Sequence, residues 1–179
     1  LVKYNSSGTK QWTKQLGSTS IPNSSEGGNG VTSDSAGNIY VTGQTNKSLD
    51  GNTHAGGLDI FLVKYNSAGT KQWTKQLGSS SSDHGAGVTS DSSDNIYVTG
   101  STSGALDGNT SSGKTDIFLV KYNSSGTKQW TKQHGSSSFH TNGRGVTSDS
   151  AGNIYVTGHT AGALDGNTHD GNPGNADII

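Results

Sequence analysis

The stretch LVKYNSSGTKQWTKQ, from Leu1 to Gln15, occurs three times in this chain. It returns as LVKYNSAGTKQWTKQ from Leu62 and, without a change, as LVKYNSSGTKQWTKQ from Leu119. The copies begin 61 and 57 residues apart. Self-similarity at such a spacing is typical of repeat architectures, in which one small unit of secondary structure is stacked several times. We therefore interpret residues 1–179 as a single repeat array with units 1–61, 62–118 and 119–179.

Each unit contains four short segments with the patterns of β-strands. Asp59 to Asn66 (DIFLVKYN) is apolar on both faces, which predicts a strand covered on both sides. Thr70 to Leu77 (TKQWTKQL) alternates between an apolar and a polar side, as expected of an outer strand. Gly87 to Ser90 (GVTS) carries small side chains, and Asn95 to Gly100 (NIYVTG) is rich in β-branched and aromatic residues.

Four antiparallel strands in every 40 to 60 residues are the unit of a β-propeller blade. Blades are crowded at the axis, so we expect the GVTS strand innermost and the Trp strand outermost. The predicted fold is an all-β propeller of four-stranded antiparallel blades, with about three blade-equivalents in this chain. In that frame the chain comprises a half-blade 1–17, blades 30–77 and 87–134, and a half-blade 145–179. The alternative is a right-handed parallel β-solenoid, whose coils are shorter, at about 20 residues.

The turn before the Ile-Tyr-Val strand differs in the middle unit. It reads Asp34-Ser35-Ala36-Gly37 in the first unit, whereas Asp94 takes the place of the glycine in the second. Asp is among the few residues that tolerate left-handed backbone angles. We therefore expect the turn to keep its geometry.

Two stretches carry a family resemblance. GVTSDSAGNIYVTGQT (Gly30 to Thr45) and DIFLVKYNSAGTKQWTKQLG (Asp59 to Gly78) resemble the bacterial β-propeller repeat family known as SBBP. The sequence departs from the family pattern where the usual Phe-Pro is replaced by Leu-Asp-Gly-Asn-Thr, and where the middle unit lacks the turn glycine. The resemblance implies a propeller of exported or surface proteins, and it carries over no catalytic residue.

Composition excludes several classes of protein. A formal net charge of −1 gives no electrostatic basis for binding nucleic acid, and the apolar run Ile60 to Val63 is far too short to insert into a membrane. Cysteine and methionine are absent, which removes disulfides and thiol catalysis. Abundant Ser, Thr, Asn and Gly without Cys fits a secreted or cell-surface bacterial protein.

Residues suited to catalysis do not recur in register. Of the six histidines only His54 and His169 share a column, and no nucleophile elbow or phosphate-binding loop occurs. Lys3, Lys64 and Lys121 lie in otherwise apolar strands, where we expect them to extend to solvent or to pair between blades. Because near-identical units supply like residues at many places rather than unlike residues at one, we predict no enzyme.

The Asp-Gly-Asn-Thr loops are the candidate metal sites. Carboxylate and amide oxygens in a glycine-bearing loop suit Ca²⁺, and each loop ends at a second acid. The candidate ligands are Asp50, Asn52, Asp59, Asp107, Asn109, Asp116, Asp165, Asn167 and Asp177. The alternative is an Asx-type turn, whose Asp and Asn side chains bond their own backbone.

The two ends of the sequence fit one another. Asp177-Ile178-Ile179 aligns with Asp59-Ile60-Phe61, so the next residue of the motif is the leucine found at Leu1. We expect incomplete blades to be completed by another copy, giving a six-bladed ring from two units or an open fibre. The predicted function is a structural, self-associating module at or outside the cell surface. The alternative is a lectin-like module that binds surface glycans through the Asp-Gly-Asn-Thr loops.

Overall fold

The computed structural model describes residues 1–18, 25–169 and 176–179, which form strands joined by turns and loops. No helix in these ranges is long and apolar enough to span a membrane. The strands are β1 (Val2–Tyr4), β2 (Lys10–Thr13), β3 (Glu26–Ser33), β4 (Ile39–Thr45), β5 (Asp59–Tyr65), β6 (Lys71–Leu77), β7 (Asp83–Ser90), β8 (Ile96–Thr102), β9 (Asp116–Tyr122), β10 (Lys128–His134), β11 (Thr141–Ser148), β12 (Ile154–Thr160) and β13 (Asp177–Ile178).

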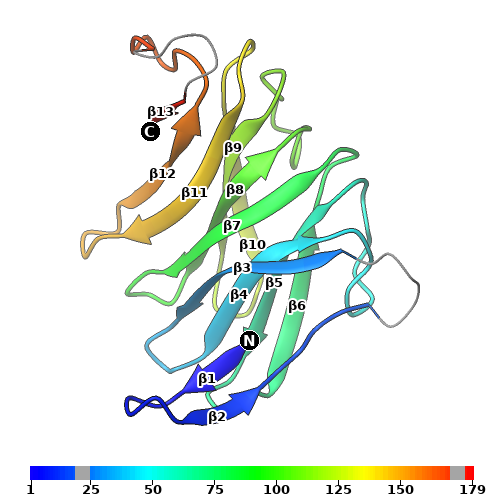
Figure 1. Cartoon of the computed structure of the whole chain (residues 1–179), viewed down its shortest axis with the longest axis vertical. Coiled ribbons are helices and arrows are strands. Elements are labelled where there is room, and N and C mark those ends of the chain that lie inside the picture. Colours follow the sequence, from blue (N-terminus) through cyan, green and yellow to red (C-terminus); the bar gives the residue numbers. More distant parts are fainter. Residues whose placement is uncertain (19–24, 170–175) are drawn as a thin grey trace.

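Two complete blades occupy the middle of the molecule. Strands β3–β6 form the first blade and β7–β10 the second, each a four-stranded sheet in sequence order with antiparallel pairing. The pair β1–β2 and the three-stranded sheet β11–β12–β13 flank them, and the array does not close into a ring (Figure 1). This confirms the predicted propeller class and the predicted order of strands within a blade.

The inner strands β3, β7 and β11 lie side by side (Figure 1). Glycine is required here, because a Cβ atom on Gly30 would stand 2.8 Å from the carbonyl oxygen of Ala86. In β7 the strand begins at Asp83, four residues before the expected Gly87. A register shift between Gly85 and Gly87 interrupts the alternation of side chains, so the sequence pattern did not reveal the first half of the strand.

The apolar core lies between blades. Tyr40, Ile60 and Leu62 of the first blade form one buried cluster with Val88 and Ile96 of the second. On the other face of the first blade, a smaller cluster packs against Leu1 and Leu16 of the chain's first segment. Its buried members are Leu49, Phe61, Val63 and Tyr65. Contact between blades therefore buries apolar side chains that the sheet of a single blade would leave exposed.

The tryptophan strand is the outermost strand of each complete blade, as predicted. Trp73 of β6 is half-buried and packs on Tyr40 of the same blade, with ring centroids 5.9 Å apart. Of the lysines expected to pair between blades, Lys3 and Lys64 do reach the next blade, where each bonds a backbone carbonyl rather than an acid. Lys64 Nζ donates to the backbone oxygen of Ser124 at 3.0 Å. Lys64 also lies 4.0 Å from Asp34 Oδ2 of its own blade.

The turn in the middle unit keeps its geometry despite the loss of glycine. Asp94 has a φ of 58°, close to the region in which Gly37 lies at 76°, which confirms the prediction. The substitution also adds a contact between blades, because Ser35 Oγ of the first blade donates to Asp94 Oδ2 at 3.1 Å.

Candidate functional site

The Asp-Gly-Asn-Thr loops begin with a tight turn. Asp50 and Gly51 have φ angles of 50° and 78°, and the Asn52 amide donates to the Leu49 carbonyl at 2.9 Å. Positive φ at both central residues is the signature of a type I′ turn, for which Asp-Gly is a favoured pair. The turns at Asp107 and Asp165 share this geometry.

The carboxylate of each turn bonds to the outer strand where that strand is present. Asp50 accepts hydrogen bonds from Lys71 Nζ and Thr74 Oγ1, both at 2.5 Å. Burial opposes its ionisation, but these two donors and the charge of Lys71 hold the pKa of Asp50 below its usual value. Asp107 bonds in the same way to Lys128 and Thr131. The Asp side chain thus bonds a neighbouring strand, and not its own backbone as the Asx-turn alternative expected.

The asparagine of the turn does bond its own backbone. Asn52 Nδ2 donates to the Leu49 carbonyl at 2.7 Å, and Asn109 and Asn167 repeat this contact with Leu106 and Leu164. In the third repeat Asp165 instead lies 2.9 Å from His134 Nε2 of the second blade.

The acids at the far ends of the loops are held apart from these turns. Asp59 is fully buried, and its Oδ2 accepts from the Ala55 amide at 2.9 Å and Gln76 Nε2 at 2.8 Å. Asp116 has the equivalent amide and glutamine donors and also Ser112 Oγ. Asp177 pairs with His169 Nδ1 at 2.8 Å. Among the residues that the structure describes, no three His, Cys, Asp or Glu side chains gather as a metal site, and calcium binding stays a prediction.

One buried acid was not singled out from the sequence. Asp83 of β7 accepts from the Ser79 amide at 2.6 Å and from the hydroxyl of Thr102. Burial raises the pKa of Asp83 despite these donors. Glu26 and Thr141 hold the same place in the flanking repeats, so no repeated column pointed to it.

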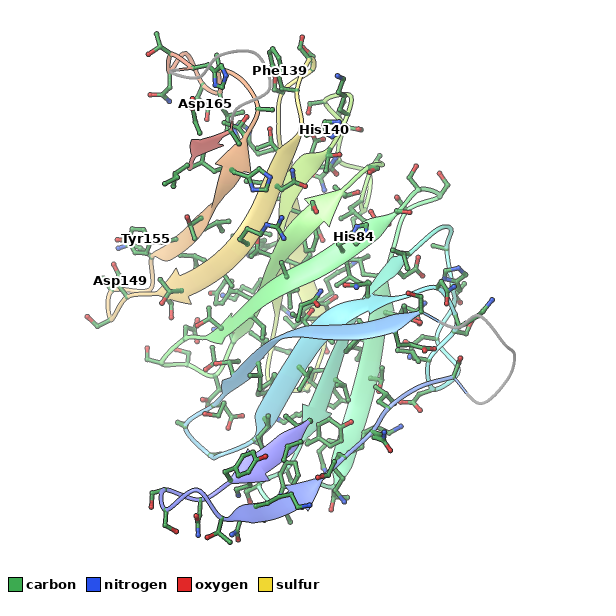
Figure 2. All side chains as sticks on the ribbon, viewed as in Figure 1. His84, Phe139, His140, Asp149, Tyr155 and Asp165 are labelled. Carbon is green, nitrogen blue, oxygen red and sulfur yellow. The ribbon has the colours of Figure 1, made fainter. Side chains whose placement is uncertain are left out.

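The third sheet presents an open groove where the other blades have their outer strand. The groove has a volume of about 670 Å³ and is lined by Leu164, Asp165, Asn167, Asp177 and Ile179, among others. Tyr155, on the same sheet but outside the groove, is 54% exposed, whereas its equivalents Tyr40 and Tyr97 are 0% and 3% exposed. Figure 2 shows Tyr155 and Asp149 at one end of this sheet and Asp165 at the other. The third sheet therefore exposes side chains that the outer strand buries in the two complete blades.

Comparison with known proteins agrees with the fold. The family model described as SBBP, a beta-propeller repeat, matches residues 11–50, 72–106 and 129–164. The chain is 31% identical over 131 residues, 62% of its length, to the "Uncharacterized WD repeat-containing protein L264" of Acanthamoeba polyphaga mimivirus. It is 27% identical over 113 residues, 55% of its length, to the "Regulatory protein FlaEY" of Caulobacter vibrioides. These stretches cover 9% and 12% of the relatives, so the chain spans about a tenth of their length. Since the family model covers more than half of the chain in three successive matches, the protein belongs to the SBBP beta-propeller repeat family.

Proposed function

We propose that this chain is a non-catalytic structural module whose third sheet is completed by β1 and β2 of another copy, on a second chain or in a longer one. The open groove beside β13 is the observation that carries the proposal. In the first blade the corresponding space is filled by β6, where Gln76 Oε1 accepts from the Leu49 amide at 3.0 Å. Leu164 and Gln15 are the equivalent residues at the open edge and on the incoming segment.

The aromatic residues at the open edge support this pairing. Tyr40 packs on Trp73 and Tyr97 on Trp130, with centroids 5.9 and 6.0 Å apart and the rings tilted by 55° in both pairs. Tyr155 occupies the same position in the third sheet, and Trp12 lies on β2. Trp12 of an incoming copy would therefore cover Tyr155 in the way that the outer strands cover the other two tyrosines.

The strand register continues across the junction. In the first blade β5 pairs with β4 from Thr45↔Asp59 to Ile39↔Tyr65. The third sheet shows only the start of this ladder, Thr160↔Asp177 and His159↔Ile178, and leaves Ile178 88% exposed. Val2–Tyr4 of a second copy would extend the ladder along β12 to Ile154. Tyr4, at 60% exposure, would then gain the cover that keeps Tyr65 4% exposed.

Two copies joined at both junctions would make six blades, within the range of about four to eight that propellers use. Repetition in one direction without closure would give a fibre. We also propose that the module works at or outside the bacterial cell surface, for which its composition and its family resemblance are the support. Cell fractionation with an antibody against the repeat would test the location.

The matched variants Gly8→Ala and Gly51→Ala test the self-association. Both glycines have positive φ (79° and 78°) and open space around them, so both changes add the same backbone strain. In the assembly only Gly8 would face an indole, that of Trp130, as Gly126 faces Trp73. By light scattering we expect the 18.3 kDa chain to form dimers or larger species with rising concentration, and Gly8→Ala to weaken association about tenfold relative to Gly51→Ala. A monomer at all concentrations, or equal association of the two variants, would contradict the proposal.

A further inference from the structure

The strands are nearly identical between repeats, and most of the columns in which they differ gather around one pocket. One such column is the fourth residue of the inner strand: Asn29, Ala86 and Arg144. Another is the sixth residue of the neighbouring strand: Gln44, Ser101 and His159. All of these except His159 line a polar pocket of about 400 Å³ where the three inner strands meet. His84 of β7 and Asn142 of β11, which share a third variable column, line it as well, and Figure 2 shows His84 at its place on β7.

Exposure alone does not account for this variation. The outer strands carry an exposed lysine and an exposed glutamine that are the same in every repeat: Lys10, Lys71 and Lys128, and Gln11, Gln72 and Gln129. Packing between repeats favours the same residue at equivalent positions, because every interface between blades is alike. A single ligand bound on the axis would instead present a different group to each blade. Unlike residues at one place are therefore what a shared binding site on a repeat scaffold requires.

The backbone holds the variable residue out of the ladder. The pairing of each inner strand shifts register around it, between Gly28 and Gly30, between Gly85 and Gly87, and between Gly143 and Gly145. A residue at such a bulge is released from strand pairing and its side chain is re-aimed, which is one reason bulges occur beside active sites. The bulge thus gives each blade one side chain that can differ without disturbing the packing.

Arg144 is the residue at the third bulge and is the single arginine of the chain. Its side chain is exposed, and within residues 1–18, 25–169 and 176–179 its guanidinium has no hydrogen bond or ion pair. Hydrogen bonds fix one of the neighbouring polar side chains. Asn29 Nδ2 donates to Gln44 Oε1 of its own blade at 2.6 Å, and to the Gly85 carbonyl of the next blade at 2.8 Å.

We propose that this axial pocket binds an acidic sugar, with the guanidinium of Arg144 holding its oxyanion. The planar guanidinium donates two parallel hydrogen bonds to a carboxylate or a phosphate. Amide and hydroxyl groups, supplied by Asn142, Ser101 and Thr115, suit the ligand's hydroxyls. None of the residues that line the pocket is acidic, so nothing in its wall competes for the arginine or repels the anion.

Titration calorimetry with glucuronate, glucose 6-phosphate and glucose tests the site. We expect at least one acidic sugar to bind about tenfold or more tightly than glucose, and the tighter of the two identifies a carboxylate or a phosphate as the preferred oxyanion. Arg144→Gln should lose about tenfold in affinity for that ligand, while Lys47→Gln, which removes one positive charge outside the pocket, should not. Equal binding of glucose, no binding of either acidic sugar, or unchanged affinity in Arg144→Gln would overturn the proposal.

Two controls keep this outcome separate from folding and from self-association. The side chain of Arg144 is exposed and forms no hydrogen bond or ion pair within the described residues, so its replacement should leave the circular dichroism spectrum and the melting temperature unchanged. All residues lining the pocket come from one chain. Gly8→Ala should therefore keep the affinity for the acidic sugar even where it abolishes association.

Discussion

The indole of Trp73 in the first blade lies against the backbone of Gly126 in the second. A Cβ atom on Gly126 would stand 2.9 Å from Trp73 Cε2, closer than such atoms approach without displacement. The same relationship joins Trp12 to Gly69, where the distance would be 3.0 Å. Gly69 and Gly126 are therefore each required for two reasons: each has a positive φ, and each leaves room for the tryptophan of the preceding unit to pack against the backbone.

Replacing Gly126 should separate these two requirements. Gly126→Ala adds both backbone strain and a clash with Trp73, whereas Gly108→Ala adds strain at a φ of 76° with open space around it. We expect Gly108→Ala to lower the free energy of unfolding by about 1 kcal/mol and Gly126→Ala by about 2–4 kcal/mol. Urea denaturation measures both. Equal losses would show that the contact between blades contributes nothing.

Much of this architecture could be predicted from repetition alone. Strand order, the outer place of the tryptophan and the left-handed Asp94 all follow from columns that recur and from known backbone preferences. Some of the parts that could not be predicted depend on residues that do not recur between repeats. Asp83 is one such residue. Ala86 is another, and the register shift at this position also breaks the alternation of side chains by which strands are recognised in a sequence. Other parts depend on contacts between distant positions. The hydrogen-bond donors to Asp50, Lys71 and Thr74, lie 21 and 24 positions along the chain, too far for a local sequence pattern to reveal them.

A hydroxyl and a histidine distinguish the surroundings of the buried acids Asp59 and Asp116. His54 Nδ1 lies 3.2 Å from Asp59 Oδ2, whereas Ser111 takes the place of this histidine before Asp116. Asp116 accepts from Ser112 Oγ, whereas Ala55 stands at the equivalent place beside Asp59, whose buried Oδ1 has no partner. Ala55→Ser should supply the missing donor and raise the free energy of unfolding by about 1 kcal/mol, or roughly 3 °C in melting temperature. Ser112→Ala is the converse control and should lower stability by a similar amount. A neutral effect of both changes would contradict this assignment.

Acid should destabilise the fold through the aspartates in the turns that join the two inner strands of a blade, such as Asp91 between β7 and β8. Burial opposes ionisation of Asp91, but hydrogen bonds from Asn95 and Tyr97 hold its pKa below the usual value. A lowered pKa in the folded state gives stability that is present above the unfolded pKa, about 4, and is lost as the pH falls through the folded value. Urea midpoints between pH 6 and 2.5 should fall, and Asp91→Asn should flatten that fall.

Asp83 has the opposite sign and provides the control for this pH dependence. Burial raises its pKa, so the folded state is favoured as Asp83 takes up a proton on acidification. Asp83→Asn removes that gain and should make the loss of stability with falling pH steeper than in the unmodified chain. If both variants changed the slope in the same direction, the assignment of the two carboxyl groups would be wrong.

Chelation tests the calcium prediction directly. The carboxylates of Asp50 and Asp107 already bond to a lysine and a threonine, which favours the turn over the metal site. We therefore expect excess chelator to leave the melting temperature unchanged. A fall of several degrees, reversed by added Ca²⁺ and not by Mg²⁺, would instead establish a bound ion through linkage.

Lys10 and Asp165 should form an ion pair between copies. Lys71 and Lys128, which share the column of Lys10, pair with Asp50 and Asp107 within their own blades. Asp165 is the equivalent acid of the third sheet, and its side chain is 67% exposed. Lys10→Asp and Asp165→Lys should each weaken association by about threefold or more, since an exposed pair contributes up to about 1 kcal/mol.

The charge-swapped double variant decides whether the two residues meet. Combining Lys10→Asp with Asp165→Lys restores opposite charges at the junction, so association should recover most of what either single change loses. Because both residues lie outside the buried core, the melting temperature of the monomer should stay within about 1 °C in all three variants. Light scattering at low and high salt measures the effect, which should shrink as salt screens the pair. If the double variant associates as weakly as the sum of the single changes predicts, Lys10 does not contact Asp165, and the junction is not built in the register of a complete blade.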